Sequence, residues 1–187
     1  MGRKSHAVER RKQILQALYE CLAEKGHERV TIKKIAQRAG LPHGVIHYYF
    51  TDKDEIIAEL IKSLQSSYYD QWEKLLSAIS GDSRKIPAAI DFLAKFMVLN
   101  PGLNRVLYNL VQMGFEKKPV RDALKEAYQV YRQQLADLFF KNSSAGEQHV
   151  SATGLLAMVE GLALQWMIEE NVVKPKQIKA LLNKVLM

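Results

Sequence analysis

The residues whose types and spacing could do chemistry gather between Thr31 and Lys53, in the segment TIKKIAQRAGLPHGVIHYYFTDK. Its lysine, arginine, histidine, threonine and tyrosine side chains suit contacts to phosphates and to the edges of bases. The segment also predicts two short helices joined by a tight turn at Gly40 and Leu41. A major groove about 12 Å wide admits one α-helix, and a helix-turn-helix presents its second helix there. The segment therefore favours contact with double-stranded DNA.

The two expected helices separate apolar residues from polar ones. Thr31 can cap the first helix, and Pro42 suits the first turn of the second. The apolar positions that would hold the helices together are Ile35, Ala36, Ala39, Val45 and Ile46. The positions left for DNA are His43, Gly44, His47 and Tyr48. Because it has no side chain, Gly44 allows a close approach of the backbone. The cations expected to neutralise phosphates are Lys33, Lys34, Arg38 and Lys53.

Other chemistry finds less support in the sequence. His43 and His47 are spaced i,i+4 and could in principle hold a metal ion, but the pair lacks the adjacent Glu of a zinc-protease helix and a third ligand nearby. The single Cys21 can form no internal disulfide. The rest of the chain offers no Gly-rich phosphate loop and no Ser-His-acid set in a recognisable context. We expect no metal, no cofactor and no enzymatic activity.

The charge of the chain is concentrated at its start. Residues 1–53 hold 11 Lys and Arg against 5 Asp and Glu, which gives +6 of the formal net charge of +7. Such asymmetry suggests a polyanionic partner for this segment, either nucleic acid or an anionic membrane. A solvated basic face is the alternative that charge alone leaves open.

The whole chain reads as helix. A first helix carries Ile14, Leu18 and Leu22 at helical spacing, and the two short helices follow it. A capping-box pattern at Asp52 and Glu55 then opens a long helix that ends near Gly81. Further helices are expected at roughly 84–99, 103–115, 119–141, 147–170 and 176–186. The fold class is all-α. We expect an N-terminal three-helix DNA-binding domain over 1–53 and a larger helical ligand-binding and dimerisation domain over 54–187.

The stretch from Arg11 to Ile57 resembles the DNA-binding domain of the TetR family of bacterial one-component regulators. The shared framework comprises Ile14, Ala17, Leu22, Gly26, Thr31, Ile35, Ala36, Ala39, Gly40, Gly44, Tyr49, Phe50 and Lys53. The resemblance implies that Thr31 sits near a phosphate, that His43 and Gly44 face base edges, and that His47, Tyr48 and Lys53 contact the backbone or neighbouring bases. Two positions depart from the family. Pro42 replaces the usual Ser or Thr, and His47 replaces the usual Tyr.

The C-terminal part carries large apolar side chains on its expected helices. Such residues line ligand cavities, although any one of them is more often ordinary core. The candidates for ligand contact are Tyr68, Trp72, Phe92, Phe96, Tyr108, Met113 and Tyr128. No acidic residue stands out as a counter-ion, so the sequence gives only a weak indication of an apolar or cationic aromatic ligand.

Two amphipathic helices close the chain and suggest self-association. The segment SATGLLAMVEGLALQWMIEEN combines an apolar stripe with small residues that permit close helix approach. It also resembles the penultimate, dimer-forming helix of a common TetR-family class. The residues expected at a homodimer interface are Leu155, Val159, Leu162, Trp166 and Leu181. A purely intramolecular core is the alternative.

These observations together predict a cytoplasmic, homodimeric regulator, most simply a repressor, that binds a palindromic operator and is released by a small-molecule effector. One rival is a helical carrier of small molecules that merely has a basic N-terminus. Another is a module on a membrane surface, but Gly40, Pro42 and Gly44 would break a continuous membrane helix. No leader is apparent, and the apolar stretch Leu155 to Ile168 is too short to span a bilayer. We therefore expect no membrane partner.

Overall fold

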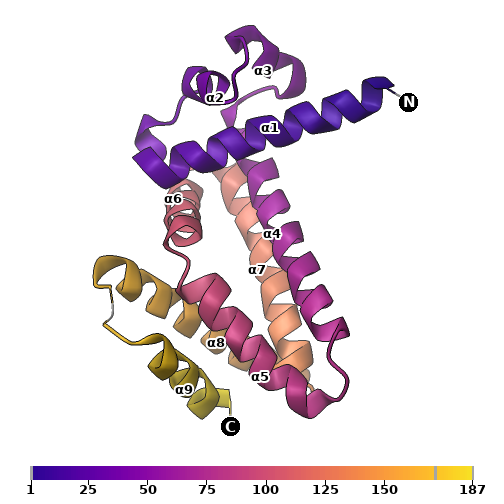
Figure 1. The fold of residues 1–187 in the computed structure, drawn as a ribbon, viewed down its shortest axis with the longest axis vertical. Coiled ribbons are helices and arrows are strands. Elements are labelled where there is room, and N and C mark those ends of the chain that lie inside the picture. Colours follow the sequence, from indigo (N-terminus) through magenta and orange to yellow (C-terminus); the bar gives the residue numbers. More distant parts are fainter. Residues whose placement is uncertain (1, 171, 187) are drawn as a thin grey trace. The chain divides into compact units, whose positions relative to one another are not determined.

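The computed structural model describes the chain over residues 2–170 and 172–186, and every element in these ranges is helical (Figure 1). The first part comprises α1 (Gly2–Lys25), η1 (His27–Arg29), α2 (Ile32–Arg38), α3 (His43–Tyr49) and α4 (Lys53–Ser77). The remainder comprises α5 (Asp82–Phe92), η2 (Leu93–Val98), α6 (Pro101–Glu116), α7 (Lys118–Phe139), α8 (Ala145–Ile168) and α9 (Pro175–Leu186). The expected all-α fold is thus confirmed.

The helix boundaries differ from the expected ones at two places. The long helix α4 ends at Ser77 instead of near Gly81. The segment expected as one helix over 84–99 is α-helical only to Phe92 and continues as the π-helix η2. The wider turn is visible where the N–H of Leu99 donates to the carbonyl of Ala94, five residues earlier, over 2.9 Å.

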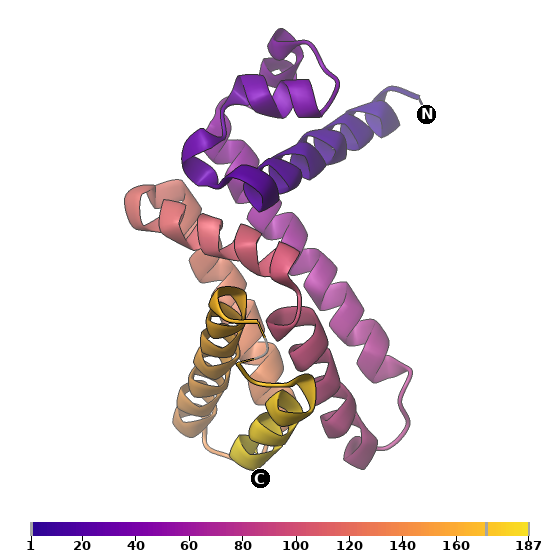
Figure 2. The same ribbon diagram turned by 60° about the vertical axis from the view of Figure 1, so that its left-hand side comes forward.

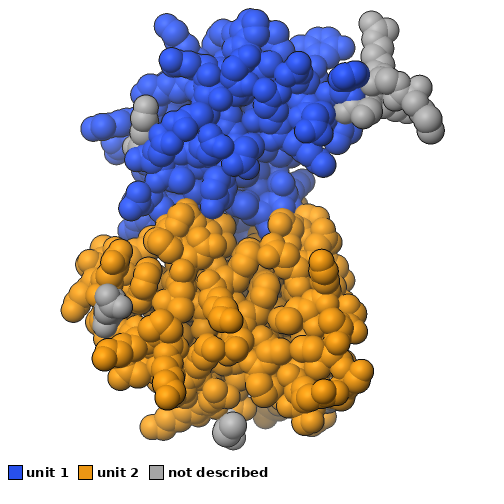
Figure 3. Space-filling model, viewed as in Figure 1, with its two compact units in different colours: residues 1–65, 105–125 blue, residues 66–104, 126–187 orange. Residues whose placement is uncertain are grey.

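The chain forms two compact units, coloured separately in Figure 3. Unit 1 comprises residues 1–65 and 105–125, and unit 2 comprises residues 66–104 and 126–187. This division differs from the boundary expected after residue 53, because unit 1 also takes in the beginning of α4 and the segment 105–125. Helices α4, α6 and α7 each contribute residues to both units.

Unit 1 surrounds a core that the N-terminal helices share. The largest fully buried side chains of unit 1 are Ile14, Leu18, Leu22, Ile35, Ile46, Phe50, Ile56, Ile57 and Leu110. The hydroxyl of Thr31 accepts a hydrogen bond from the N–H of Lys34, which confirms the predicted cap of α2. At the start of α4, Asp52 Oδ1 accepts from the N–H of Glu55, while the Glu55 carboxylate reaches back to the N–H of Thr51. These bonds satisfy donors that a helix start leaves open.

Unit 2 has its own core, in which α9 packs on α5 and η2 while α8 packs on η2 (Figure 2). The buried residues include Trp72, Ile90, Leu93, Val98, Leu155, Val159, Ile178 and Leu182. Helix α8 begins with a capping box in which Ser144 and Glu147 bond each other's backbone N–H groups. The sequence therefore fixes the start of α8 locally, through polar side chains, as well as through apolar packing.

The turn between α2 and α3 depends on Gly40, whose φ of 64° lies in the left-handed region. Side chains with a Cβ are disfavoured there by about 1–2 kcal/mol, even though an added Cβ at Gly40 would meet no atom within 4 Å. We expect Gly40→Ala to lower the free energy of unfolding by about 1 kcal/mol. Urea unfolding followed by circular dichroism measures this, and an unchanged midpoint would show that the turn relaxes without cost.

Candidate functional site

Helix α1 holds α2 and α3 in place by bonding the ends of both helices, which lie along it in Figure 1. Gln13 Nε2 donates to the carbonyl of Ala39 over 2.6 Å, just after the last turn of α2. The guanidinium of Arg11 donates to the carbonyl of Tyr49, the last residue of α3. Helix C-termini leave carbonyls without intrahelical partners, so these bonds satisfy them and fix the position of each short helix.

Arg11 also ties α3 to α4. Its Nε donates to Glu59 Oε1 over 2.9 Å, a further pair joins it to Glu55, and its guanidinium lies 4.1 Å from the centre of the Phe50 ring. The hydrogen bonds and charge of Glu59 raise the pKa of Arg11, so the group stays cationic. One side chain therefore joins three helices and stacks on the residue that ends the helix-turn-helix.

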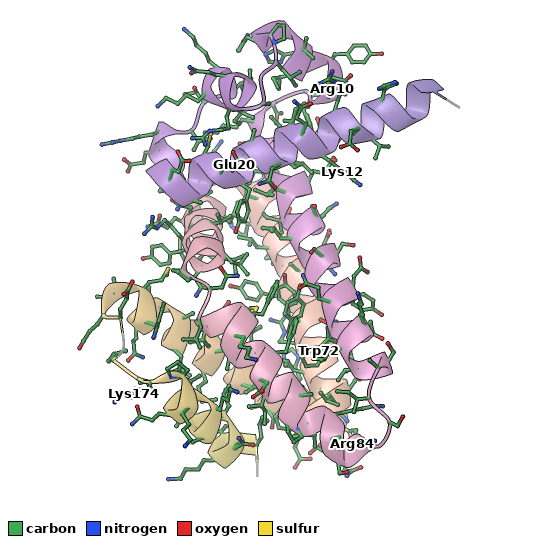
Figure 4. The ribbon with its side chains drawn as sticks, viewed as in Figure 1. Arg10, Lys12, Glu20, Trp72, Arg84 and Lys174 are labelled. Carbon is green, nitrogen blue, oxygen red and sulfur yellow. The ribbon has the colours of Figure 1, made fainter. Side chains whose placement is uncertain are left out.

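Replacing this clamp is expected to loosen unit 1. Lysine keeps the charge of Arg11 but loses the planar fork, so we expect Arg11→Lys to lower the free energy of unfolding by about 1–3 kcal/mol. Arg10→Lys is the matched control, because the described bond of Arg10, which Figure 4 labels, reaches only Gln13 on the same helix. Thermal unfolding of both variants is the measurement. Equal stability of the two would show that the Arg11 contacts contribute nothing.

The outer side of α3 carries the predicted reading residues. His43, Gly44, His47 and Tyr48 are all exposed, and the Tyr48 side chain is 82% exposed, whereas Ile46 is fully buried. Pro42 precedes α3 and provides no side-chain cap, as its departure from the family implied. The His43 and His47 rings meet edge to face at 5.3 Å, and within the described residues no set of three His, Cys, Asp or Glu groups could hold a metal ion.

The predicted phosphate-binding cations fall into two groups. Lys33 is exposed, and Lys34 is exposed while its amine donates to the carbonyl of Arg29. The other two cations, the exposed Arg38 and the part-buried Lys53, bond to residues of unit 1 that are distant in sequence, which the sequence did not indicate. Arg38 forms ion pairs with Glu20 and Glu24 of α1.

Lys53, the second of these cations, donates to the carbonyl of Val30 over 2.9 Å. Burial lowers its pKa, and the nearby charge of Lys117 lowers it further. Its amine therefore holds the segment before α2 in place, and only its remaining N–H donors are left for a phosphate.

Unit 2 brings most of the predicted ligand residues into one aromatic cluster. Tyr68, Trp72, Phe92, Phe96 and Tyr131 form it, with ring centres 4.9 to 6.2 Å apart. Trp72 is 2% exposed and is labelled in Figure 4. Tyr128 packs against the same core from α7.

Two predicted ligand residues lie outside unit 2. Tyr108 is 46% exposed and Met113 is buried, and both belong to unit 1. The sequence could not show this, because it gave no sign that residues 105–125 pack with the N-terminal helices. His27 and Asn109 show the connection, since the Asn109 Oδ1 accepts from the N–H of His27 over 2.8 Å.

Unit 2 also contains a cavity of about 460 Å³ that α4, α5 and α7 line. Its walls include Tyr69, Leu76, Ile86 and Val130, and Trp72 connects it to the aromatic cluster. Gln134 lines the same cavity and is 8% exposed, and among the described residues neither of its buried amide atoms has a hydrogen-bond partner. Buried amides are nearly always paired in folded proteins, so Gln134 marks a place where a bound group would satisfy the protein.

The residues chosen for a subunit interface need correction. Leu155, Val159 and Leu162 are 1%, 1% and 8% exposed and belong to the core of unit 2, so they leave little surface for a second chain. Trp166 is half-buried against the same core, and only Leu181 keeps a large exposed area, at 37%. The cause is that α8 is apolar on every side, so its sequence does not reveal which stripe faces inward.

The exposed side of α8 is apolar as well. Small residues, Gly154, Ala157 and Gly161, lie between Val150 at one end and Leu164 and Ile168 at the other. Their spacing places them on one face of the helix, and Ile168 is 82% exposed. Among the described helices, α8 alone is long and apolar enough to cross a membrane by length and composition. It is longer than the apolar stretch from Leu155 to Ile168 that the sequence suggested.

Comparison with known proteins gives matches over nearly the whole chain. Residues 14–60 match bacterial regulatory proteins of the tetR family, and residues 84–187 match the C-terminal part of BetI-type transcriptional repressors. The nucleoid occlusion factor SlmA of Vibrio vulnificus is 27% identical over 159 residues, which cover 81% of each chain.

Two further proteins are similar over more of their length. The HTH-type transcriptional regulator PksA of Bacillus subtilis is 27% identical over 179 residues, covering 91% of this chain and 84% of that one. A transcriptional regulator of Saccharomonospora viridis, solved in complex with choline, has the same fold, with a TM-score of 0.78, 22% identity and 95% of each chain covered.

Proposed function

The chain belongs to the TetR family of bacterial regulatory proteins and is a DNA-binding transcriptional regulator, and we propose that it is a homodimeric repressor which a small molecule releases from a palindromic operator. The observation that carries this proposal is the division of roles in unit 1. Buried contacts and hydrogen bonds hold α2 and α3 from behind, while the outer side of α3 presents His43, Gly44, His47 and Tyr48 without obstruction.

In this proposal α3 lies in the major groove. His43 reads base edges, Gly44 allows the backbone to come close, and His47 and Tyr48 contact neighbouring bases or the sugar-phosphate backbone. Thr31, Lys33 and Lys34 bond or neutralise phosphates at the start of α2. Lys53 contacts a phosphate with the N–H donors of its amine that the bond to the Val30 carbonyl leaves unused.

The dimer is proposed to form through the exposed sides of α8 and α9. Val150, Leu164 and Ile168 leave an apolar stripe in water, and the small residues between them let a second helix approach closely. Leu181 and Val185 extend the apolar surface on α9. Pairing in a two-fold dimer removes this surface from water. It therefore also explains why α8 is apolar on its exposed side in a protein that acts on DNA in the cytoplasm.

The effector is proposed to bind in unit 2. The regulator of Saccharomonospora viridis was solved in complex with choline, so a protein of this fold holds a small molecule. The cavity of about 460 Å³ has the size of small-molecule sites, and the amide of Gln134 supplies a polar anchor in it. The walls combine apolar side chains with the charged side chains of Glu73, Lys85, Asp137 and Lys141. Helix α4 carries residues of both units, so a ligand that prefers one arrangement of unit 2 can shift the population of dimers whose two α3 helices match the operator.

Mapping the bound sites across the genome tests the proposed role. A repressor is expected to occupy one or a few sites near promoters, with two half-sites related by a two-fold axis and about one helical turn apart. The similarity to SlmA supports a second candidate, a nucleoid occlusion factor, and occupied sites spread over the chromosome instead of near promoters would favour it. Occupied sites without any shared sequence would contradict both functions.

A further inference from the structure

Gln134 on α7 is a buried amide whose two polar atoms find nothing to bond in the described chain. Its side chain is 8% exposed, and among the described residues neither Oε1 nor Nε2 has a hydrogen-bond partner. The neighbouring Gln133 differs, because it is exposed and its Nε2 donates to Asp137 Oδ1 over 2.7 Å. A buried polar group left unpaired destabilises a protein, and most such groups in folded proteins are paired. Gln134 therefore offers a donor and an acceptor, side by side, to a molecule from outside the chain.

The cavity of about 460 Å³ in unit 2 gives such a molecule access to Gln134. Helix α7 lines it with Val130, Gln134 and Leu138, which are spaced at i, i+4 and i+8 and therefore share one face of the helix. Helix α4 lines it with Trp72 and Leu76, which are also one turn apart. Trp72 is 2% exposed, so the indole and the amide both belong to the buried part of the cavity. A ligand that reaches Gln134 is thus held between apolar side chains.

The charged side chains of the cavity are balanced in sign. Glu73 and Asp137 are acidic, whereas Lys85 and Lys141 are basic. Glu73, Asp137 and Lys141 are exposed, so water also weakens the field that they produce at a ligand. A lining with as many carboxylates as amines attracts neither cations nor anions as a whole. The cavity therefore suits an uncharged ligand.

We infer that the effector of this regulator is an uncharged molecule with an amide-type group, an N–H beside a C=O as in a lactam or a carboxamide, and that Gln134 bonds both parts of this group. The inference rests on the proposed function, because it specifies the ligand of unit 2. The N–H of the ligand donates to Gln134 Oε1, and Gln134 Nε2 donates to the carbonyl of the ligand. The sequence gave only a weak indication of an apolar or cationic aromatic ligand, because no local pattern shows that Gln134 is buried without a partner.

The two unpaired atoms of Gln134 distinguish this class of ligand from others. A carboxylate accepts from Nε2 but has no hydrogen to donate to Oε1. An ammonium group donates to Oε1 but offers no acceptor to Nε2. A hydroxyl has to serve both atoms from one oxygen, which bends both hydrogen bonds away from a straight geometry. A ligand amide is planar, as the amide of Gln134 is, so the two groups can form two straight and parallel hydrogen bonds.

Isothermal titration calorimetry on the full-length protein tests the inference with two pairs of probes. The first pair is the lactam 3,4-dihydroquinolin-2(1H)-one and the ketone 2-tetralone, in which a CH₂ replaces the N–H. The second pair is the open-chain carboxamide benzamide and the ketone acetophenone. We expect at least one amide to bind, and its ketone analogue to bind at least about tenfold more weakly, because the ketone leaves Oε1 of Gln134 unpaired. The tighter of the two amides shows whether the cavity takes a cyclic or an open-chain group.

Replacing Gln134 with methionine assigns the preference to this residue. Methionine has a similar length but neither an amide N–H nor a carbonyl, so we expect Gln134→Met to bind the amide and its ketone analogue with equal affinity. Gln129→Met is the matched control, because Gln129 is exposed on the same helix and does not line the cavity. It should prefer the amide as the wild type does.

Three results would overturn the inference: neither amide binds, the wild type binds each amide no more tightly than its ketone analogue, or Gln134→Met still prefers the amide. If Gln134→Met fails to fold, the comparison of amide and ketone on the wild type decides. A protein that binds its operator but neither amide retains the proposed function without this effector class. One that binds an amide through Gln134 but binds no DNA loses the proposed function instead.

Discussion

Replacing Ala157 with glutamate is expected to convert the dimer to a monomer and to weaken operator binding by about a hundredfold or more. Ala157 lies in the middle of the exposed stripe of α8, between Gly154 and Gly161. In a two-fold dimer, each chain would place its new carboxylate in a closely packed apolar contact. The two carboxylates would also lie near each other and repel. Each monomer would then bind only one half-site, without the gain that simultaneous binding of two half-sites brings.

Light scattering after gel filtration measures the mass, and fluorescence anisotropy measures the DNA affinity of the same sample. Gln129→Glu is the control, because Gln129 is exposed on α7 and the charge change is comparable. It should remain dimeric. Ala157→Glu at dimer mass with unchanged DNA affinity would place the subunit interface elsewhere on the protein.

Replacing Gly44 with alanine is expected to separate DNA binding from stability. An added Cβ at Gly44 meets no atom within 4 Å, and Gly44 does not have the positive φ of Gly40. Alanine favours a helix over glycine by about 1 kcal/mol, so the free energy of unfolding should stay equal or rise slightly. The new methyl group would stand between the α3 backbone and the bases, so specific affinity should fall at least about tenfold.

Affinity for operator and for random DNA should be measured together for this variant. Specific binding should weaken while nonspecific binding, which depends on phosphate contacts, changes little. Gly146→Ala makes the same chemical change at an exposed position in α8, again with no atom within 4 Å, and should leave DNA binding intact. Full specific affinity in Gly44→Ala would mean that α3 does not approach the bases at this residue.

The helix-turn-helix was predictable because its signals are local. Thr31 at a cap, Gly40 at a left-handed turn and the spacing of Ile35 and Ile46 all act within a few residues, and the structure confirms each of them. The outward direction of His43 and its neighbours follows from the same periodicity.

The features that sequence reasoning missed depend on residues far apart in the chain. Arg11 finds Glu59 across 48 residues, and Tyr128 finds Glu160 across 32. Nothing in the local pattern distinguishes Arg11 from Arg10, or Glu160 from any other acidic residue. Lys53 shows a similar case, because a cation expected to face DNA also bonds the carbonyl of Val30, 23 residues away.

The faces of α8 were the hardest feature to assign from sequence. Its stripe with Leu155 and Val159 and its stripe with Leu164 and Ile168 are both apolar, so periodicity cannot choose between core and interface. Packing against η2 puts Leu155 and Val159 in the core of unit 2 and leaves the stripe with Leu164 and Ile168 exposed.

The measurement that tests the central claim most directly is the anisotropy of full-length protein with DNA from immediately upstream of its own gene, at two salt concentrations and with random DNA in excess. Autoregulation by a sequence-specific repressor predicts tight binding that survives the competitor, and it predicts a loss of affinity with salt that reflects the phosphate contacts of α2 and α3. The account is contradicted if random DNA displaces the protein from this fragment and from every other fragment of the genome. The N-terminal surface would then bind DNA through its charge alone.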